Sequence, residues 1–444
     1  MLRTFITVLT ALLFTGIFSI ACSSGGPGGG AADWQAAHDT IGDTIVVRTL
    51  SGSIWRDTAQ LVPEVSIGMF DGPEEYIFGN VVSLARGPDG TIYVMDRQVP
   101  ALRVYDADGT YRTTFGRGGE GPGEYQQPDG GLNVLSDGRI VLRDPGNARI
   151  QVFSTEGESV ETWRIRGNFN TSRRMVVDQM DRSHALILMD PEASVTDWKT
   201  GLVQINPDGT MGDTLVIPDT PWEEPTIVAS HESDDGDTSM SVNSVPFGPT
   251  ENAVLSPRGY FIHGISTEYA LTLLRNDGPT LRIEKVFTPV AVASGEREEE
   301  EARATRNMRY TEPNWRWNGP PIPDVKPPFS RFYAGEDGTL WVAVHQPAKR
   351  VEDPSYDPTD PDAIPDEWRE PILFDVFDDD GSYLGAVRAP DGLSRYPQPV
   401  FTREWVLGIV LDEFDVQTVV RFRVDLPGAG STDSARDSGP LEIH

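Results

Sequence analysis

The stretch GPDGTIYVMD, from Gly87 to Asp96, recurs forty-eight residues later as LSDGRIVLRD, from Leu135 to Asp144. Each copy places an Asp-Gly pair before an apolar run and ends in aspartate. An Asp-Gly pair between apolar runs predicts a β-hairpin, because glycine adopts positive φ without a Cβ clash. The regular spacing of the copies indicates a chain built from repeated structural units.

The sequence after each copy stays in the same register. ALRVY at 101–105 corresponds to RIQVF at 149–153, and a second turn follows nineteen residues after the first, at Gly109 and at Gly157. Two such hairpins make a four-stranded antiparallel sheet. A single sheet of this size leaves apolar faces in water, so these units become stable by packing face to face around an axis.

Weaker copies of the unit continue along the chain, over residues 180–217, 256–287, 335–387 and 403–424. The last copy has room for only about three strands, whereas TIVVRTLSG, from Thr44 to Gly52, has no other partner. We therefore predict an all-β fold: a six-bladed β-propeller of four-stranded antiparallel blades over residues 44–426. We expect Thr44–Gly52 to close the last blade, which removes exposed sheet edges.

The segment from Ile67 to Ile165 resembles NHL repeats. Their blades read as a turn, an apolar strand ending in Asp, an Arg-Ile-hydrophobic strand and a Gly-rich passage to the next blade. GEGPGEYQQP, from Gly119 to Pro128, is typical of that passage, and DGPEEY at Asp71–Tyr76 is a degenerate copy. The resemblance continues only as a pattern to Leu426. It implies similarity to bacterial lipoproteins that carry six-bladed propellers.

The N-terminus has the layout of an export signal. A short basic start is followed by an apolar run from Phe5 to Ile20 and by Cys22, the single cysteine of the chain. Ser19-Ile20-Ala21-Cys22 resembles a bacterial lipobox, with serine where leucine is usual. We predict a lipoprotein signal peptide at 1–21, lipidation of Cys22 and a flexible tether at 22–43. The alternatives are an ordinary signal peptide and an uncleaved transmembrane helix.

Location and partners follow from the same features. Ser23 stands where aspartate would imply retention at the inner membrane, so we expect a bacterial cell-envelope protein anchored by lipid at the outer membrane. The formal charge of −31 disfavours binding to nucleic acid. A single cysteine rules out an intramolecular disulfide and a CxxC site.

Three segments interrupt the blades. SGEREEEEAR begins a predicted surface helix over 294–308, in which Glu299 and Arg303 are spaced to pair. The rest of this insert, to residue 329, carries Trp315 and Trp317, and a second insert at 347–371 carries Trp368. These tryptophans either contact a ligand or pin the inserts to the blades. Residues 218–252 are predicted to be a mobile loop, and 427–444 a disordered tail.

Several carboxylates and histidines are candidate metal-binding or catalytic residues. The aspartates of the second insert are candidate calcium ligands: Asp353, Asp357, Asp360, Asp362 and Asp366. They do not follow the Asp-x-Asp-x-Asp-Gly order of calcium loops, so the alternative is a solvated acidic loop. The aspartates that end equivalent strands are expected to accept backbone N–H groups of the following turn: Asp96, Asp144 and Asp190. His263 and His345 lie near the ends of corresponding strands. The chain contains no HExxH, GxSxG, phosphate-loop or dinucleotide motif.

The expected function is that of a binding module without catalytic, cofactor or metal residues. Its loops and inserts would present Trp315, Trp317 and Trp368 to a protein, peptide or glycan, an expectation that rests on fold analogy. The alternative is a propeller hydrolase or lyase, gluconolactonase-like or streptogramin-lyase-like, with a metal such as calcium in the central channel. Three or more Asp, Glu, Asn or His side chains converging at one mouth of the channel would favour the enzyme.

Overall fold

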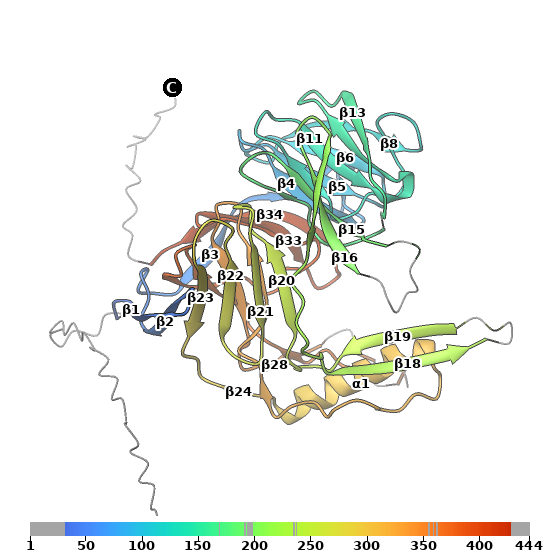
Figure 1. Ribbon diagram of the computed structural model, residues 1–444. Helices are drawn as coiled ribbons and strands as arrows, with labels where there is room; N and C mark the ends of the chain where they lie inside the picture. The colour runs from blue at the N-terminus through green and yellow to red at the C-terminus, as the bar shows by residue number, and fades with distance from the viewer. Residues whose placement is uncertain are drawn as a thin grey trace, which may run out of the picture. The chain divides into compact units, whose positions relative to one another are not determined.

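The computed structural model describes residues 32–427 except 168, 191, 193–198, 234–235, 237, 354–355, 358 and 361–362 (Figure 1). The chain from Ala32 onward forms one compact unit. Cys22, the predicted signal peptide, Asp362 and residues 428–444 lie outside the described residues. Within the described ranges, no helix is long and apolar enough to cross a membrane.

The first three blades are consecutive four-stranded antiparallel sheets. Blade one contains β4 (Val81–Arg86), β5 (Ile92–Asp96), β6 (Ala101–Tyr105) and β7 (Tyr111–Phe115). Blade two contains β10 (Leu132–Val134), β11 (Ile140–Asp144), β12 (Arg149–Phe153) and β13 (Ser159–Arg164). Blade three contains β14 (Val176–Val177), β15 (Ser183–Leu188), β16 (Thr200–Ile205) and β17 (Met211–Val216). The quoted repeat thus forms the second strand of blades one and two, as predicted.

The last three blades follow the same order and confirm the predicted fold class. Blade four contains β20 (Glu251–Leu255), β21 (Phe261–Ile265), β22 (Ala270–Leu274) and β23 (Thr280–Lys285). Blade five contains β26 (Phe329–Ala334), β27 (Leu340–Val344), β30 (Leu373–Phe377) and β31 (Tyr383–Arg388). Blade six contains β32 (Val400–Phe401), β33 (Trp405–Leu411), β34 (Gln417–Asp425) and β3 (Ala59–Ile67).

An N-terminal strand closes the last blade, but it is not the predicted one. β3 pairs antiparallel with β34, whereas β2 (Thr44–Ser51) pairs in parallel with β23 of blade four and carries β1 (Gln35–Ile41) on its outer edge. The prediction that Thr44–Gly52 closes blade six is therefore wrong. Pro63 concealed the true strand, because proline argues against a paired strand, and here it is accommodated where the register shifts between Pro63 and Val65.

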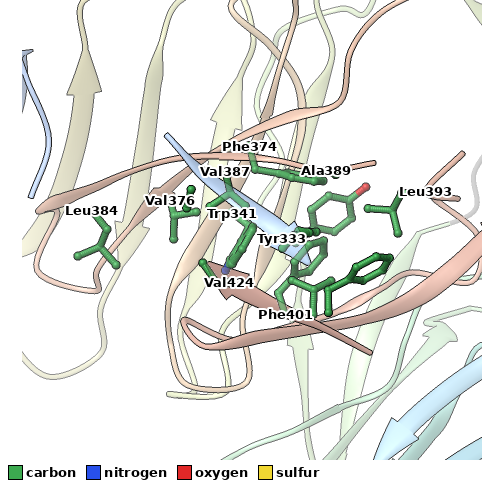
Figure 2. Close-up of a cluster of buried hydrophobic side chains, with 14 of the residues drawn as sticks. Tyr333, Trp341, Phe374, Val376, Leu384, Val387, Ala389, Leu393, Phe401 and Val424 are labelled. Atoms are coloured by element: carbon green, nitrogen blue, oxygen red, sulfur yellow. The ribbon is translucent and has the colours of Figure 1, made fainter. Parts of the chain in front are cut away.

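Each blade packs against the next through apolar side chains, and blade six packs against blade one. The cluster between blades five and six contains Trp341, Phe374 and Phe401 (Figure 2). The interface between blades three and four differs, because its buried apolar members among the described residues are Leu186, Leu202 and Leu255 alone. This interface is the least sealed of the six.

The inserts form an appendage with a core of its own. Helix α1 (Ser294–Thr311) extends the predicted helix by three residues, and Arg303 pairs with Glu299 at 3.1 Å as expected. Residues 218–252 are not simply a loop, because they contain the hairpin of β18 (Thr226–Glu232) and β19 (Thr238–Ser244). The hairpin lies beside α1 (Figure 1). Apolar side chains of β18 pack against α1 and Trp315, which supplies the burial that stabilises the hairpin.

Short elements complete the described chain. They are η1 (Glu74–Tyr76), β8 (Arg117–Gly118), β9 (Glu124–Tyr125), η2 (Pro145–Asn147), β24 (Val290–Ala291), β25 (Val325–Lys326), β28 (Lys349–Arg350) and β29 (Trp368–Arg369). The parallel pair of β8 and β9 lies in the Gly-rich passage between blades one and two. β24 pairs with β25, and β28 pairs with β29, so these two-residue strands brace the inserts.

Two glycines with the same φ lie in repeated turns that differ in how tightly they are packed. Gly157 and Gly259 both have φ of +84°, but a Cβ on Gly157 would lie 2.1 Å from the ring of Phe115, whereas a Cβ on Gly259 would meet nothing within 4 Å. We expect Gly157→Ala to destabilise the protein by about 1–3 kcal/mol more than Gly259→Ala, since only the first adds overpacking to backbone strain. Chemical denaturation of both variants measures the difference, and equal losses would contradict the prediction.

Candidate ligand-binding cavity

The first strands of the blades surround an open cavity of about 570 Å³. Its walls come from β4, β10, β14, β20 and β26 and from residues 395–398, which lead into β32. All six blades therefore contribute to one site. Its volume falls in the range of roughly 300–1,000 Å³ that is usual for small-molecule sites in proteins.

Arginine dominates the charged part of this lining. The basic side chains that line the cavity are Arg86, Arg173, Arg174, Arg331 and Arg395, and the acidic ones are Asp181 and Glu336. The lining thus carries five positive charges against two negative ones, in a chain whose formal charge is −31. The net charge of the cavity lining is therefore positive, opposite in sign to the net charge of the whole chain.

Both carboxylates of the lining already have protein partners. Glu336 accepts a hydrogen bond from Arg174 at 2.6 Å, which links the turn after β26 to the segment before β14. Asp181 accepts hydrogen bonds from the backbone N–H of Ser136 at 3.0 Å and from its hydroxyl. These contacts join blade three to blades five and two, so the carboxylates help to hold the walls together.

Apolar side chains form the rest of the walls. Leu186, Leu202 and Leu255 line the cavity and are also the buried members of the small cluster between blades three and four. The cavity therefore extends into this interface, which explains why so few side chains are sealed there. Phe332 and Tyr333 of β26 lie on the side of blade five. The site combines an apolar surface with cationic groups.

Burial affects the arginines directly. Desolvation lowers the pKa of Arg86, and the nearby Arg421 lowers it further. Desolvation also lowers the pKa of Arg173. The Arg86 guanidinium thus lies where a positive charge has lost water without gaining enough compensating negative charge, whereas Arg173 as a whole is exposed.

Arg86 and Arg331 could have been found from the sequence, because each lies on a first strand just before a repeated Gly-containing turn, in LARGPDG and SRFYAGEDG. First strands face the axis of a propeller. The sequence criterion counted Asp, Glu, Asn and His side chains, and four of them line the cavity: Asn133, Asp181, Asn252 and Glu336. Each of the four already has a protein hydrogen-bond partner. The criterion did not consider arginine, which dominates the charged part of the lining. Arg173 and Arg174 come from an irregular segment whose position no repeat predicted.

The three tryptophans of the inserts do not line the cavity. Trp315 is 1% exposed, and its indole N–H donates to the carbonyl of Val228 at 2.7 Å. Its ring is thus closed to a ligand, and it pins the insert as the alternative interpretation expected. Trp317 is half-buried and donates to the carbonyl of Pro320 at 2.8 Å. Trp368 is half-buried against Gly295 of α1.

The recurrent aspartates of blades one and two accept backbone N–H groups, but mainly from the segment before each blade and not from the following turn as predicted. Asp96 is fully buried and accepts the backbone N–H groups of Gly79, Asn80 and Gln98. Asp144 is also fully buried and accepts those of Gln126 and Gln127, in the passage that leads into blade two.

Asp190 differs, because it is exposed and accepts only the N–H of Glu192 among the described residues, at 3.2 Å. Asp96 and Asp144 therefore connect blades one and two to the segments that precede them.

The histidines and the acidic insert are not brought together. His263 contacts Glu251 at 2.6 Å and His345 contacts Glu370 at 3.0 Å, and neither histidine lines the cavity. Asp366 pairs with Arg303 and Arg369, which places it in an ion-pair network with α1. Among residues 32–427, apart from the gaps given above, no group of three or more His, Cys, Asp or Glu side chains is arranged to hold a metal ion.

A second hollow, of about 590 Å³, lies beside Tyr269, Lys285 and Asp375. Its polar groups satisfy one another, because Asp375 accepts hydrogen bonds from Tyr269 at 2.6 Å, Tyr383 at 2.5 Å and Lys285 at 2.7 Å. A carboxylate with three protein donors has little capacity left for a ligand. The cavity among the first strands is the stronger candidate.

Comparison with known proteins agrees with the architecture. A family model described as a 6-bladed beta-propeller (DUF5128) matches residues 71–162, which hold nearly all of the first two blades. The chain is a six-bladed β-propeller. No curated protein matches the sequence.

Solved propellers resemble the chain at low identity. A DUF4221 family member from Bacteroides vulgatus has 11% identity and a TM-score of 0.49, over 82% of this chain and 98% of that one. Virginiamycin B lyase from Staphylococcus aureus has 9% identity and a TM-score of 0.37, over 81% and 98%. A gluconolactonase from Xanthomonas campestris has 12% identity and a TM-score of 0.35, over 82% and 97%.

Proposed function

We propose that this protein is an NHL-type binding module of the bacterial cell envelope, whose ligand occupies the cavity among the first strands. The observation that carries the proposal is the cavity itself, about 570 Å³ in volume and lined from all six blades. Its arginines and apolar side chains are groups that hold and orient a ligand. The site replaces the insert tryptophans as the proposed point of contact.

Occlusion of the cavity tests this function. Ala334 lines the cavity, whereas Ala348 lies outside it. We expect the unit from Ala32 to His444 to retain specific small molecules from envelope extracts, as detected by native mass spectrometry. Ala334→Trp should lose this retention because the indole fills ligand space, while Ala348→Trp should keep it. Equal retention by both folded variants would place the ligand elsewhere, and conversion of the retained molecule would favour the hydrolase or lyase alternative.

We also propose that Cys22 carries a lipid that anchors the propeller at the outer membrane. The lipobox-like Ser19–Cys22 and the Gly/Ser-rich segment after it support this proposal, because a flexible spacer separates a folded unit from an acylated cysteine. We expect Cys22→Ser to move the protein from the membrane fraction to the soluble periplasmic fraction. Continued sedimentation of the variant with membranes would contradict the anchor.

A further inference from the structure

We propose that the cavity binds a small organic anion that carries carboxylate or phosphate groups. This inference rests on the proposed function and names the chemical class of its ligand. The positive lining within a strongly acidic chain is the central observation. An anion approaching other parts of this protein meets net repulsion, so a concentrated group of arginines gives the site its selectivity.

Most of these arginines have no acidic partner among the described residues. Arg174 pairs with Glu336. Within the part of the chain that the structure describes, no ion pair involves Arg86, Arg173, Arg331 or Arg395. Asp181, the other acid of the lining, is held by Ser136. The cavity therefore contains guanidinium groups whose charge the protein does not neutralise by direct pairing.

The guanidinium groups also retain unused hydrogen-bond donors. The Nε atoms of Arg86, Arg174 and Arg331 are buried and have no hydrogen-bond partner in the described part of the chain. A buried donor without a partner is costly, so protein acceptors do not fully satisfy these guanidinium groups. The same three arginines, from blades one, three and five, line the cavity.

Aromatic side chains support two of these arginines. The guanidinium of Arg86 lies 4.8 Å from the ring centroid of Trp405, and that of Arg331 lies 6.0 Å from the ring of Tyr396. Stacking of this kind restrains the planar group while leaving its N–H edge available to an acceptor. The arginines are thus positioned for binding without being consumed by internal ion pairs.

The use of arginine identifies the chemistry of the ligand groups. All the basic side chains of the lining are arginine, and none is lysine. A guanidinium binds carboxylate or phosphate through two parallel hydrogen bonds, which a neutral hydroxyl cannot match and a cation would oppose. The arginines come from four blades, so their donors surround the cavity and several of them can act on one anionic ligand. Half-buried Val134, Val176 and Val254 of the lining provide an apolar surface for the organic part.

Binding of simple probes tests this inference. We would titrate the unit from Ala32 to His444 with citrate and with fructose 1,6-bisphosphate by calorimetry at low salt, with glucose as the neutral comparison. We expect both anions to bind and glucose not to bind. Arg331→Gln should weaken binding by about tenfold or more, because it removes a charge-assisted donor pair. Arg388→Gln removes the same charge from an exposed position on β31 outside the cavity and should change the affinity by less than about twofold.

The outcomes separate this inference from the proposed function. Equal weakening by Arg331→Gln and Arg388→Gln would show general charge attraction and overturn the anion site. If neither anion binds but the unit retains neutral molecules that Ala334→Trp excludes, the ligand class is wrong and the binding function stands. If neither anions nor extracts supply any ligand, both proposals fail. Arg173→Gln serves as a second cavity variant should Arg331→Gln fold poorly.

Discussion

Trp341→Ala should lower the free energy of unfolding by about 3–5 kcal/mol, because it empties a large fully buried volume between two blades. The indole of Trp341 lies 4.9 Å from the ring centroid of Phe401 in blade six and 5.7 Å from that of Phe374 in blade five (Figure 2). Its N–H donates to the hydroxyl of Thr339 at 3.2 Å. The substitution thus removes packing on both sides of the interface.

Urea denaturation followed by circular dichroism measures this loss. Trp341→Phe is the informative control, because it retains a ring between Phe374 and Phe401 and gives up only part of the volume. We expect its loss to be less than half of that of Trp341→Ala. A loss below about 1 kcal/mol for Trp341→Ala would mean that the blades collapse into the space, and would contradict a tightly packed interface.

The propeller itself was predictable because its signal is local and repeated. Asp-Gly turns require positive φ wherever they occur, and Gly90, Gly109, Gly138 and Gly157 all have it. Alternating apolar residues between the turns predict strands by the same rule in every blade. Repetition turns a modest local preference into a firm prediction of the fold.

Pairing between distant strands was less predictable. β2 and β3 both alternate in hydrophobicity, and their positions depend on which apolar neighbour each can cover. Val47 of β2 joins the cluster between blades four and five, while Val65 and Ile67 of β3 join the cluster between blades six and one. The local pattern is similar in both strands, so only tertiary packing distinguishes them.

The site was the least predictable part. Arg86 and Arg331 each precede a repeated turn, but Arg174 lies in an irregular segment, and single arginines in a sequence usually lie at a solvated surface. Their convergence follows from the ring of first strands rather than from local sequence. The inserts attracted attention through their tryptophans, yet the burial of Trp315 shows that those aromatic residues stabilise the appendage.

The attachment of α1 to blade five depends on one buried lysine. Lys326 has a fully buried side chain and donates to Glu296 of α1, to Glu370 at 2.8 Å and to the carbonyl of Gln346 at 3.2 Å. Burial alone would raise the pKa of Glu370, but hydrogen bonds from His345 and Lys326 and from the backbone N–H of Gln346 lower it to about 2. The carboxylate is therefore held in its charged form.

Replacement of this cation should be strongly destabilising. Lys326→Met leaves Glu296 and Glu370 without their shared cation, and we expect it to lower the free energy of unfolding by about 3–5 kcal/mol at pH 7. Lys349→Met, at an exposed lysine on β28, is the matched control and should cost less than about 0.5 kcal/mol. Urea denaturation at pH 7 compares the two, and similar midpoints would contradict a role for Lys326 in holding the appendage.

The same cluster predicts how stability depends on pH. Because the pKa of Glu370 is about 2 in the folded protein and 4.5 ordinarily, its contribution is fully present above about pH 4.5 and is lost as the pH falls toward 2. Lys326→Met removes one cause of the low pKa, so the difference in unfolding free energy between wild type and variant should shrink over this acidic range. Denaturation at pH 7, 4.5 and 3 measures that difference. A difference that stays constant with pH would show that the lysine acts through packing rather than through its charge.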